Sequence, residues 1–138
     1  MTTINCINEI RSEVGEGPNW DAGTSTISWV DIAGKLWFEQ NIDGGSVTSH
    51  SVPEVIGAIV GRKKGGYYAA TKEGFAELNS DNGWKVTKDF LKEDERMNDA
   101  KVDSAGRFWA GSCTMGFVPG TGSLHVLSGD LTMKTVAT

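Results

Sequence analysis

A repeat of about 40 residues is the sequence feature that most constrains the fold of this chain. Trp29, Tyr68 and Trp109 lie 39 and 41 residues apart, at comparable points of three similar segments. Each segment has a glycine-containing turn, an aromatic strand, a second strand, a tight turn and a polar last strand. A period of ~40–45 residues with about four strands in each unit is typical of a β-propeller blade.

Local signals agree with this pattern. Asn82-Gly83 is a strong type I′ hairpin signal, and the apolar run at residues 56–60 predicts a buried inner strand. We therefore expect an all-β fold, with residues 1–138 forming one domain of about three blades. Its blades are expected at about 14–55, 56–96 and 97–138. Periodicity alone leaves open an unrelated β-sandwich or meander, because short alternating strands suit either fold.

The charge and the termini exclude several classes of partner. A net charge of −5 argues against nucleic acid, since a phosphate-binding surface needs excess lysine and arginine. The basic cluster at residues 62–64 is expected to be a solvated turn flank, with an anion contact as the alternative. No apolar run approaches the ~18 residues of a membrane span. We see no secretory signal at residues 1–13, so a cytoplasmic location is expected by default.

Two long motifs carry a resemblance to a known family. The first is GEGPNWD at residues 15–21, followed by ISWVDI at 27–32, and the second is RMNDAKVDSAGRFWAGS at 96–112. With TGSL at 121–124, they resemble the signatures of the SMP-30/gluconolactonase/luciferin-regenerating (regucalcin-like) family. The resemblance implies a six-bladed propeller with a divalent metal at one mouth of its channel. This chain would supply about three four-stranded blades.

The resemblance assigns candidate site residues. Glu16 matches a metal ligand, and a carboxylate between glycines suits Ca²⁺, Mg²⁺, Mn²⁺ or Zn²⁺. Asn98 matches a residue that meets the metal or the substrate, and Arg96 and Asp99 are further substrate-binding candidates. The competing structural roles are an exposed turn for Glu16, an Asx-turn for Asn98, and a structural role for Asp99. For Arg96, the competing structural role is a salt bridge with Glu93 or Asp94.

Two departures from the family pattern stand out. Some members carry an acidic residue near the substrate after the third aromatic strand, whereas residues 113–117 contain none. In addition, the family's Asn metal ligand and its Asp base are expected beyond Thr138. Three blades cannot close a ring, since propellers have ~4–8. The chain is therefore a fragment, a half that pairs with itself, or a half that pairs with a second chain, and we favour pairing.

The leading functional prediction is a metal-dependent hydrolase of sugar lactones or related esters. Catalysis is uncertain, because the expected general base is absent from this chain. The chain has no Gly-x-Ser-x-Gly elbow, and His50 and His125 are expected to be structural. The alternative is a non-catalytic propeller module that binds a metal, a small ligand or a protein partner. A truncated, inactive remnant is the third possibility.

Overall fold

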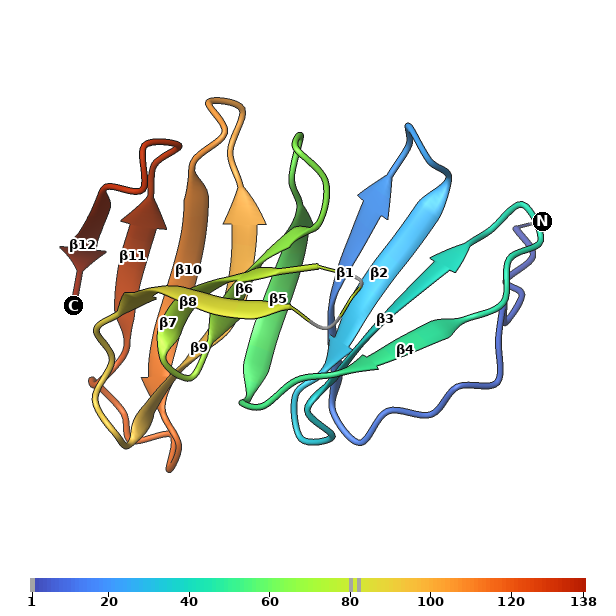
Figure 1. The fold of residues 1–138 in the computed structure, drawn as a ribbon. Coiled ribbons are helices and arrows are strands. Elements are labelled where there is room, and N and C mark those ends of the chain that lie inside the picture. The colour runs from blue at the N-terminus through green and yellow to red at the C-terminus, as the bar shows by residue number, and fades with distance from the viewer. Residues whose placement is uncertain (1, 80, 82) are drawn as a thin grey trace.

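The regular structure of this chain is built from β-strands. The computed structural model describes residues 2–79, 81 and 83–138, and its strands form three four-stranded antiparallel sheets (Figure 1). The strands are β1 (Gly15–Asp21), β2 (Thr26–Asp31), β3 (Leu36–Asn41), β4 (Thr48–Ser51), β5 (Ile56–Gly61), β6 (Tyr67–Thr71), β7 (Gly74–Leu78), β8 (Trp84–Asp89), β9 (Glu95–Val102), β10 (Phe108–Thr114), β11 (Ser123–Leu127) and β12 (Met133–Ala137). Asn82, on which the type I′ turn prediction depends, lies outside the described residues.

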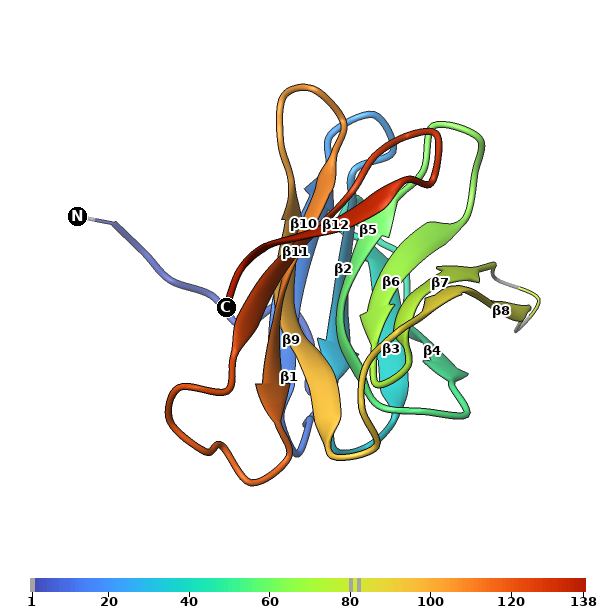
Figure 2. The same cartoon turned by 90° about the vertical axis from the view of Figure 1, so that its left-hand side faces the viewer.

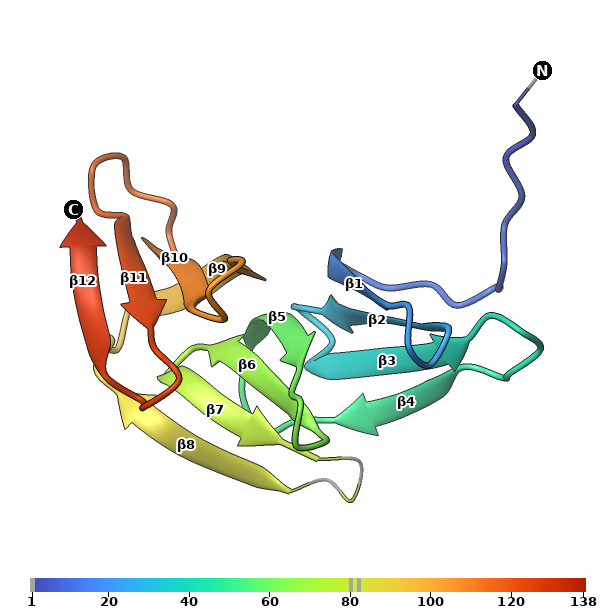
Figure 3. The same ribbon diagram turned by 90° about the horizontal axis from the view of Figure 1, so that it is seen from above.

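Each sheet is one propeller blade. We call β1–β4 blade one, β5–β8 blade two and β9–β12 blade three, and in each the strands pair in chain order. Seen from above, the blades form an open arc with β1, β5 and β9 innermost (Figure 3). The expected all-β fold with three four-stranded blades is confirmed, and the β-sandwich alternative is wrong because the strands do not form two packed sheets.

Burial follows the place of each strand in its blade. The inner strand β5 has buried side chains from Ile56 to Val60, as its apolar run predicts. β10 alternates between buried and half-buried residues, because its two faces meet different surroundings. The outermost strand β12 is mostly exposed, which fits its polar, β-branched sequence.

Two apolar clusters hold the blades together. The first packs blade one on blade two and includes Val30, Trp37 and Ile59, with the His50 ring stacked 3.9 Å from that of Trp37. The second packs blade two on blade three and is formed by the residues Ala58, Val60, Ala70, Phe75, Met97, Ala100, Phe108, Ala110 and Leu127. Burying these apolar faces is the main favourable contribution to blade packing.

His125 is a structural residue of blade three. It is buried, with Nδ1 2.9 Å from the Thr135 hydroxyl and Nε2 3.0 Å from the Ser112 hydroxyl. Burial lowers the pKa of His125, against the attraction of Glu95. Both ring nitrogens therefore have partners within the blade.

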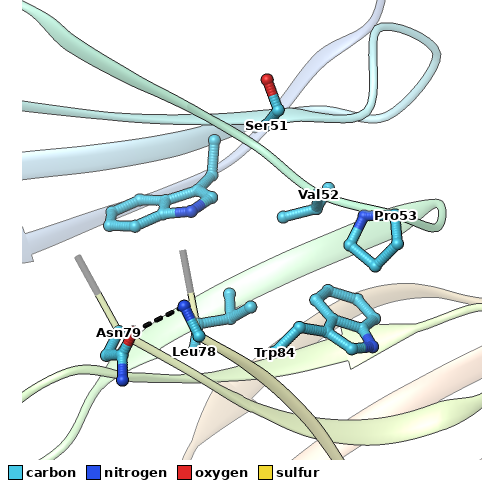
Figure 4. A pocket seen from close by; sticks show the side chains of 8 residues that line it. Ser51, Val52, Pro53, Leu78, Asn79 and Trp84 are labelled. Carbon is cyan, nitrogen blue, oxygen red and sulfur yellow. Dashed lines mark hydrogen bonds between the residues drawn. The ribbon is translucent and has the colours of Figure 1, made fainter. Parts of the chain in front are cut away.

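The outer strands of blades one and two meet at a small pocket, where Val52 and Pro53 face Leu78 and Trp84 (Figure 4). The dashed line in Figure 4 is the 2.6 Å hydrogen bond from the Gly83 amide to the Asn79 side chain. The pocket has a volume of about 10 Å³, which is room for no more than one water molecule. It belongs to the packing of the blades and is no ligand site.

The segment before β1 is extended and leads away from the sheets (Figure 2). It is joined to blade one by a 2.9 Å hydrogen bond from the side-chain Nδ2 of Asn8 to Oε1 of Gln40. The described residues contain no helix long and apolar enough to span a membrane.

Candidate functional site

The three innermost strands carry the same irregularity at the same level. Each has one extra residue relative to its neighbour, at residues 16–19 in β1, 56–58 in β5 and 97–100 in β9. Such β-bulges bend a strand and turn its side chains in new directions, and they are frequent next to active sites. All the candidate site residues except Arg96 lie in these bulges, and Arg96 directly precedes the third.

Glycine lets the innermost strands approach closely there. Gly17 has φ +58°, and a Cβ on it would lie 3.3 Å from the Ala58 Cα atom. A Cβ on Gly57 would clash with the Asn98 carbonyl and lie 2.8 Å from the Met97 carbonyl oxygen. The backbone around Gly57 is therefore wedged between the segments that carry Glu16 and Asn98, so these two candidates lie at the same level of the innermost strands.

Asp31 anchors the chain that leads to Glu16, a role that the sequence reasoning missed. Its buried carboxylate accepts hydrogen bonds from the Glu13 amide at 2.9 Å, the Val14 amide at 3.0 Å and the Gly34 amide at 3.1 Å. Burial alone raises the pKa of Asp31, but these backbone hydrogen bonds outweigh burial and hold the pKa below its usual value. Glu16 itself is exposed and forms no ion pair with any described residue.

Arg96 is buried, with 6% of its surface exposed. Its Nη1 atom donates to the Met97 carbonyl and to Asn98 Oδ1, both at 2.9 Å. Its guanidinium carbon lies 5.4 Å from the centre of the Phe117 ring. The ion pairs of the described residues include none from Arg96 to Glu93 or Asp94, so the guanidinium is held by neutral groups.

The two other candidates have different surroundings. Because Asn98 Oδ1 accepts from Arg96, the Asn98 amide nitrogen is the group left to donate to a ligand. The neighbouring guanidinium also disfavours a second cation on that oxygen. Asp99 accepts a 2.7 Å hydrogen bond from the Ala100 amide and so stabilises its own bulge. Lys101 reaches across to blade one, where its Nζ lies 3.4 Å from the Pro18 carbonyl oxygen.

A comparison with known families identifies the chain. Residues 14–138 match the family described as the SMP-30/Gluconolactonase/LRE-like region. The chain belongs to this family. Among similar proteins, regucalcin of Xenopus laevis is 34% identical over 135 residues, which are 92% of this chain and 45% of that protein. The 6-deoxy-6-sulfogluconolactonase of Pseudomonas putida is 34% identical over 114 residues, 80% of this chain and 39% of that enzyme.

Solved structures show the same fold. A calcium-binding protein, regucalcin, from Agrobacterium tumefaciens str. C58 superposes with a TM-score of 0.87 and 19% identity, over 95% of this chain and 45% of that one. The chain thus spans a little under half the length of the relatives it matches. The expected resemblance to the N-terminal half of the SMP-30 family is confirmed.

The donor atoms beside the bulges of the innermost strands are of a type that fits a divalent cation. The Glu16 carboxylate is a hard oxygen ligand, which Ca²⁺ and Mg²⁺ prefer. No group of three His, Cys, Asp or Glu side chains among the described residues could hold a metal ion. Among the described residues, Glu16 is therefore not part of a cluster of three such side chains.

Proposed function

We propose that the propeller to which this chain contributes three blades is a metal-dependent hydrolase of sugar lactones or related esters. The observation that carries the proposal is the convergence of Glu16 with the Arg96–Asn98 pair at one end of the innermost strands. Membership in a family with a named sulfogluconolactonase supports a lactone as the substrate.

Each candidate residue has a separate role in the proposed reaction. Glu16 would hold one divalent cation, Ca²⁺, Zn²⁺, Mn²⁺ or Mg²⁺, which when bound polarises an acyl carbonyl. The amide nitrogen of Asn98 and the guanidinium of Arg96 would orient the substrate's hydroxyl and carbonyl oxygens. Asp99 keeps the bulge that presents Asn98 in place. The general base comes from another part of the complete assembly.

Glu16→Gln is expected to lower kcat/KM for D-glucono-1,5-lactone about 100-fold at limiting metal, a loss of ~2.7 kcal/mol of transition-state stabilisation. Hydrolysis is followed by proton release, in chelated protein and after addition of Ca²⁺, Zn²⁺, Mn²⁺ or Mg²⁺. Glu13→Gln is the matched control, because Glu13 is exposed, close to Glu16 in the chain, and loses the same charge. Hydrolysis that survives both chelation and Glu16→Gln would contradict the metal's role.

The ring must be completed by further blades, and we propose a second copy of this chain as the partner, or a separate second half. Trp20 on blade one and Leu124 and Val136 on blade three are exposed apolar residues. Large exposed apolar areas favour association. A two-fold axis along the channel would place two copies of Glu16 and Asn98 at the same mouth.

Light scattering on a sizing column is expected to give twice the 14.8 kDa mass of the chain. Because a dimer of three-bladed halves reaches six blades, this mass would fit a closed ring. A monomer at micromolar concentration would count against self-pairing and leave the separate second half as the partner.

The second candidate function is a non-catalytic module that binds a metal, a small ligand or a protein partner. It is favoured by the exposed apolar side chains of Trp20, Leu124 and Val136, which suit a surface that contacts a protein partner. A folded, metal-binding dimer that does not hydrolyse lactones would support this function over the first.

A further inference from the structure

A cleft lies towards the other end of the innermost strands from Glu16 and Asn98, and it reaches as far as Asn19, the last residue of the β1 bulge. It has a volume of about 830 Å³ and opens between blades one and two. It is lined by the last residues of β1, β5 and β9 and by the turns that join β1 to β2 and β5 to β6, at the top of Figure 1. Asp21 at this end and Glu16 at the other are about 16 Å apart along the extended strand β1.

A hydrogen-bonded network crosses the wall of the cleft. The Tyr67 hydroxyl of blade two donates to Glu39 Oε2 of blade one at 2.8 Å. The other carboxylate oxygen of Glu39 lies 3.2 Å from Nε2 of the buried His50. Burial and the hydrogen bond with Glu39 raise the pKa of Tyr67, so its hydroxyl stays protonated. The network holds the Glu39 carboxylate at the cleft with lone pairs free to accept from a ligand.

The other polar groups of the cleft mix donors, acceptors and both charges. Ser28, only 2% exposed, lies beside the Tyr67 hydroxyl. The charge of Asp21 is close enough to Tyr67 to help raise the pKa of its hydroxyl. Lys63 and Lys101 also line the cleft. The remaining neutral polar lining residues are Asn19, Thr24 and Thr26.

These charges oppose a strongly charged ligand of either sign. An anion would meet the carboxylates of Asp21 and Glu39, whereas a cation would meet the two lysines. Arg62 adds little positive charge to the cleft, since its guanidinium pairs with Glu77 at 3.2 Å and lies over the Tyr68 ring. A neutral ligand with many hydroxyl groups satisfies both the acceptors and the donors.

We propose that this cleft binds a neutral carbohydrate, at a site separate from the mouth that carries Glu16 and Asn98. The volume falls within the ~300–1,000 Å³ of small-molecule sites and admits a mono- or disaccharide. Glu39 and Asp21 accept hydrogen bonds from sugar hydroxyls, and Asn19 and Lys101 supply donors. The site depends only on blades one and two and β9, and it does not rest on lactone hydrolysis at the other mouth.

Amide chemical shifts of the ¹⁵N-labelled chain test the site. Titration with D-glucose and with maltose is expected to give saturable shifts at Ser28, Tyr67 and Gly61, with a Kd on the order of 1 mM. The amide chemical shifts of Glu16 and Asn98 are expected to stay unchanged. D-gluconate and D-glucosamine serve as charged probes. Absence of saturable shifts at the cleft, or stronger binding of either charged probe there, would overturn the proposal.

Two tyrosines on one strand provide a matched pair of variants. Tyr67→Phe removes the hydroxyl that holds Glu39 and is expected to weaken maltose binding about tenfold. Tyr68→Phe loses a comparable hydrogen bond, to Thr87 at 2.9 Å, on the other face of β6, and is expected to leave binding unchanged. Equal maltose affinities of Tyr67→Phe and Tyr68→Phe would overturn the proposed carbohydrate site.

Glu39→Gln provides a second test if Tyr67→Phe does not fold. The amide oxygen can still accept from Tyr67, but the carboxylate charge is lost, and maltose binding is expected to weaken severalfold. Glu54→Gln, which breaks the ion pair with Lys35, is the control, because neither of these residues lines the cleft. Unchanged maltose affinity in Glu39→Gln would contradict the role of this carboxylate.

Discussion

Gly57→Ala is expected to destabilise the chain by about 3 kcal/mol, because the added methyl group has no space between β5 and β9. A Cβ at this position would clash with the Asn98 carbonyl and lie 2.8 Å from the Met97 carbonyl oxygen. Both are backbone atoms, so relief requires β5 and β9 to move apart. That movement would weaken the apolar cluster between blades two and three, which includes Ala58 and Met97.

Urea unfolding of the native chain and of Gly57→Ala measures this difference in the free energy of unfolding. Gly61→Ala is the matched control on the same strand, because a Cβ there meets no atom within 4 Å. The control is expected to change stability by less than about 1 kcal/mol. Similar unfolding midpoints for the two variants would show that β5 and β9 are not packed as closely as described.

Asp31→Ala is expected to cost about 4 kcal/mol of stability. The substitution leaves the amides of Glu13, Val14 and Gly34 without their acceptor, and hydrogen bonds to a charged group are worth ~1.5–3 kcal/mol each, though not additively. Asp130→Ala is the control, since that exposed carboxylate accepts from one backbone amide, of Thr132 at 2.9 Å. Equal losses in the two variants would contradict the anchoring role of Asp31.

The contribution of Asp31 depends on pH in a defined direction. Its pKa in the folded chain lies below the ordinary aspartate value of 3.8, so the folded state binds a proton less readily than the unfolded state. The stabilisation is therefore present above a pH of about 4 and is lost as the pH falls through the folded-state pKa. In urea titrations, the stability gap between the native chain and Asp31→Asn is expected to shrink below that pH. A gap that stays constant to the lowest pH at which the chain folds would contradict this.

The repeat and its motifs are readable from the sequence because their physical causes are local. Strand alternation, turn glycines and β-branched edge residues act over a few positions, so the spacing of Trp29, Tyr68 and Trp109 predicts the three blades. The apolar run at 56–60 likewise predicts the buried strand β5. Glu16, Arg96, Asn98 and Asp99 could be selected only through family resemblance, and their roles in this chain stay predictions.

Other features of the site were decided only by the tertiary structure. Asp31 accepts from amides 17 and 18 residues earlier in the chain, and the burial of Arg96 depends on how blade three folds over it. The wedged position of Gly57 and the cleft at Glu39 and Tyr67 depend on the distance between neighbouring blades. No local pattern encodes that distance, because it is set when the faces of separate sheets pack together and their side chains fill the space between them.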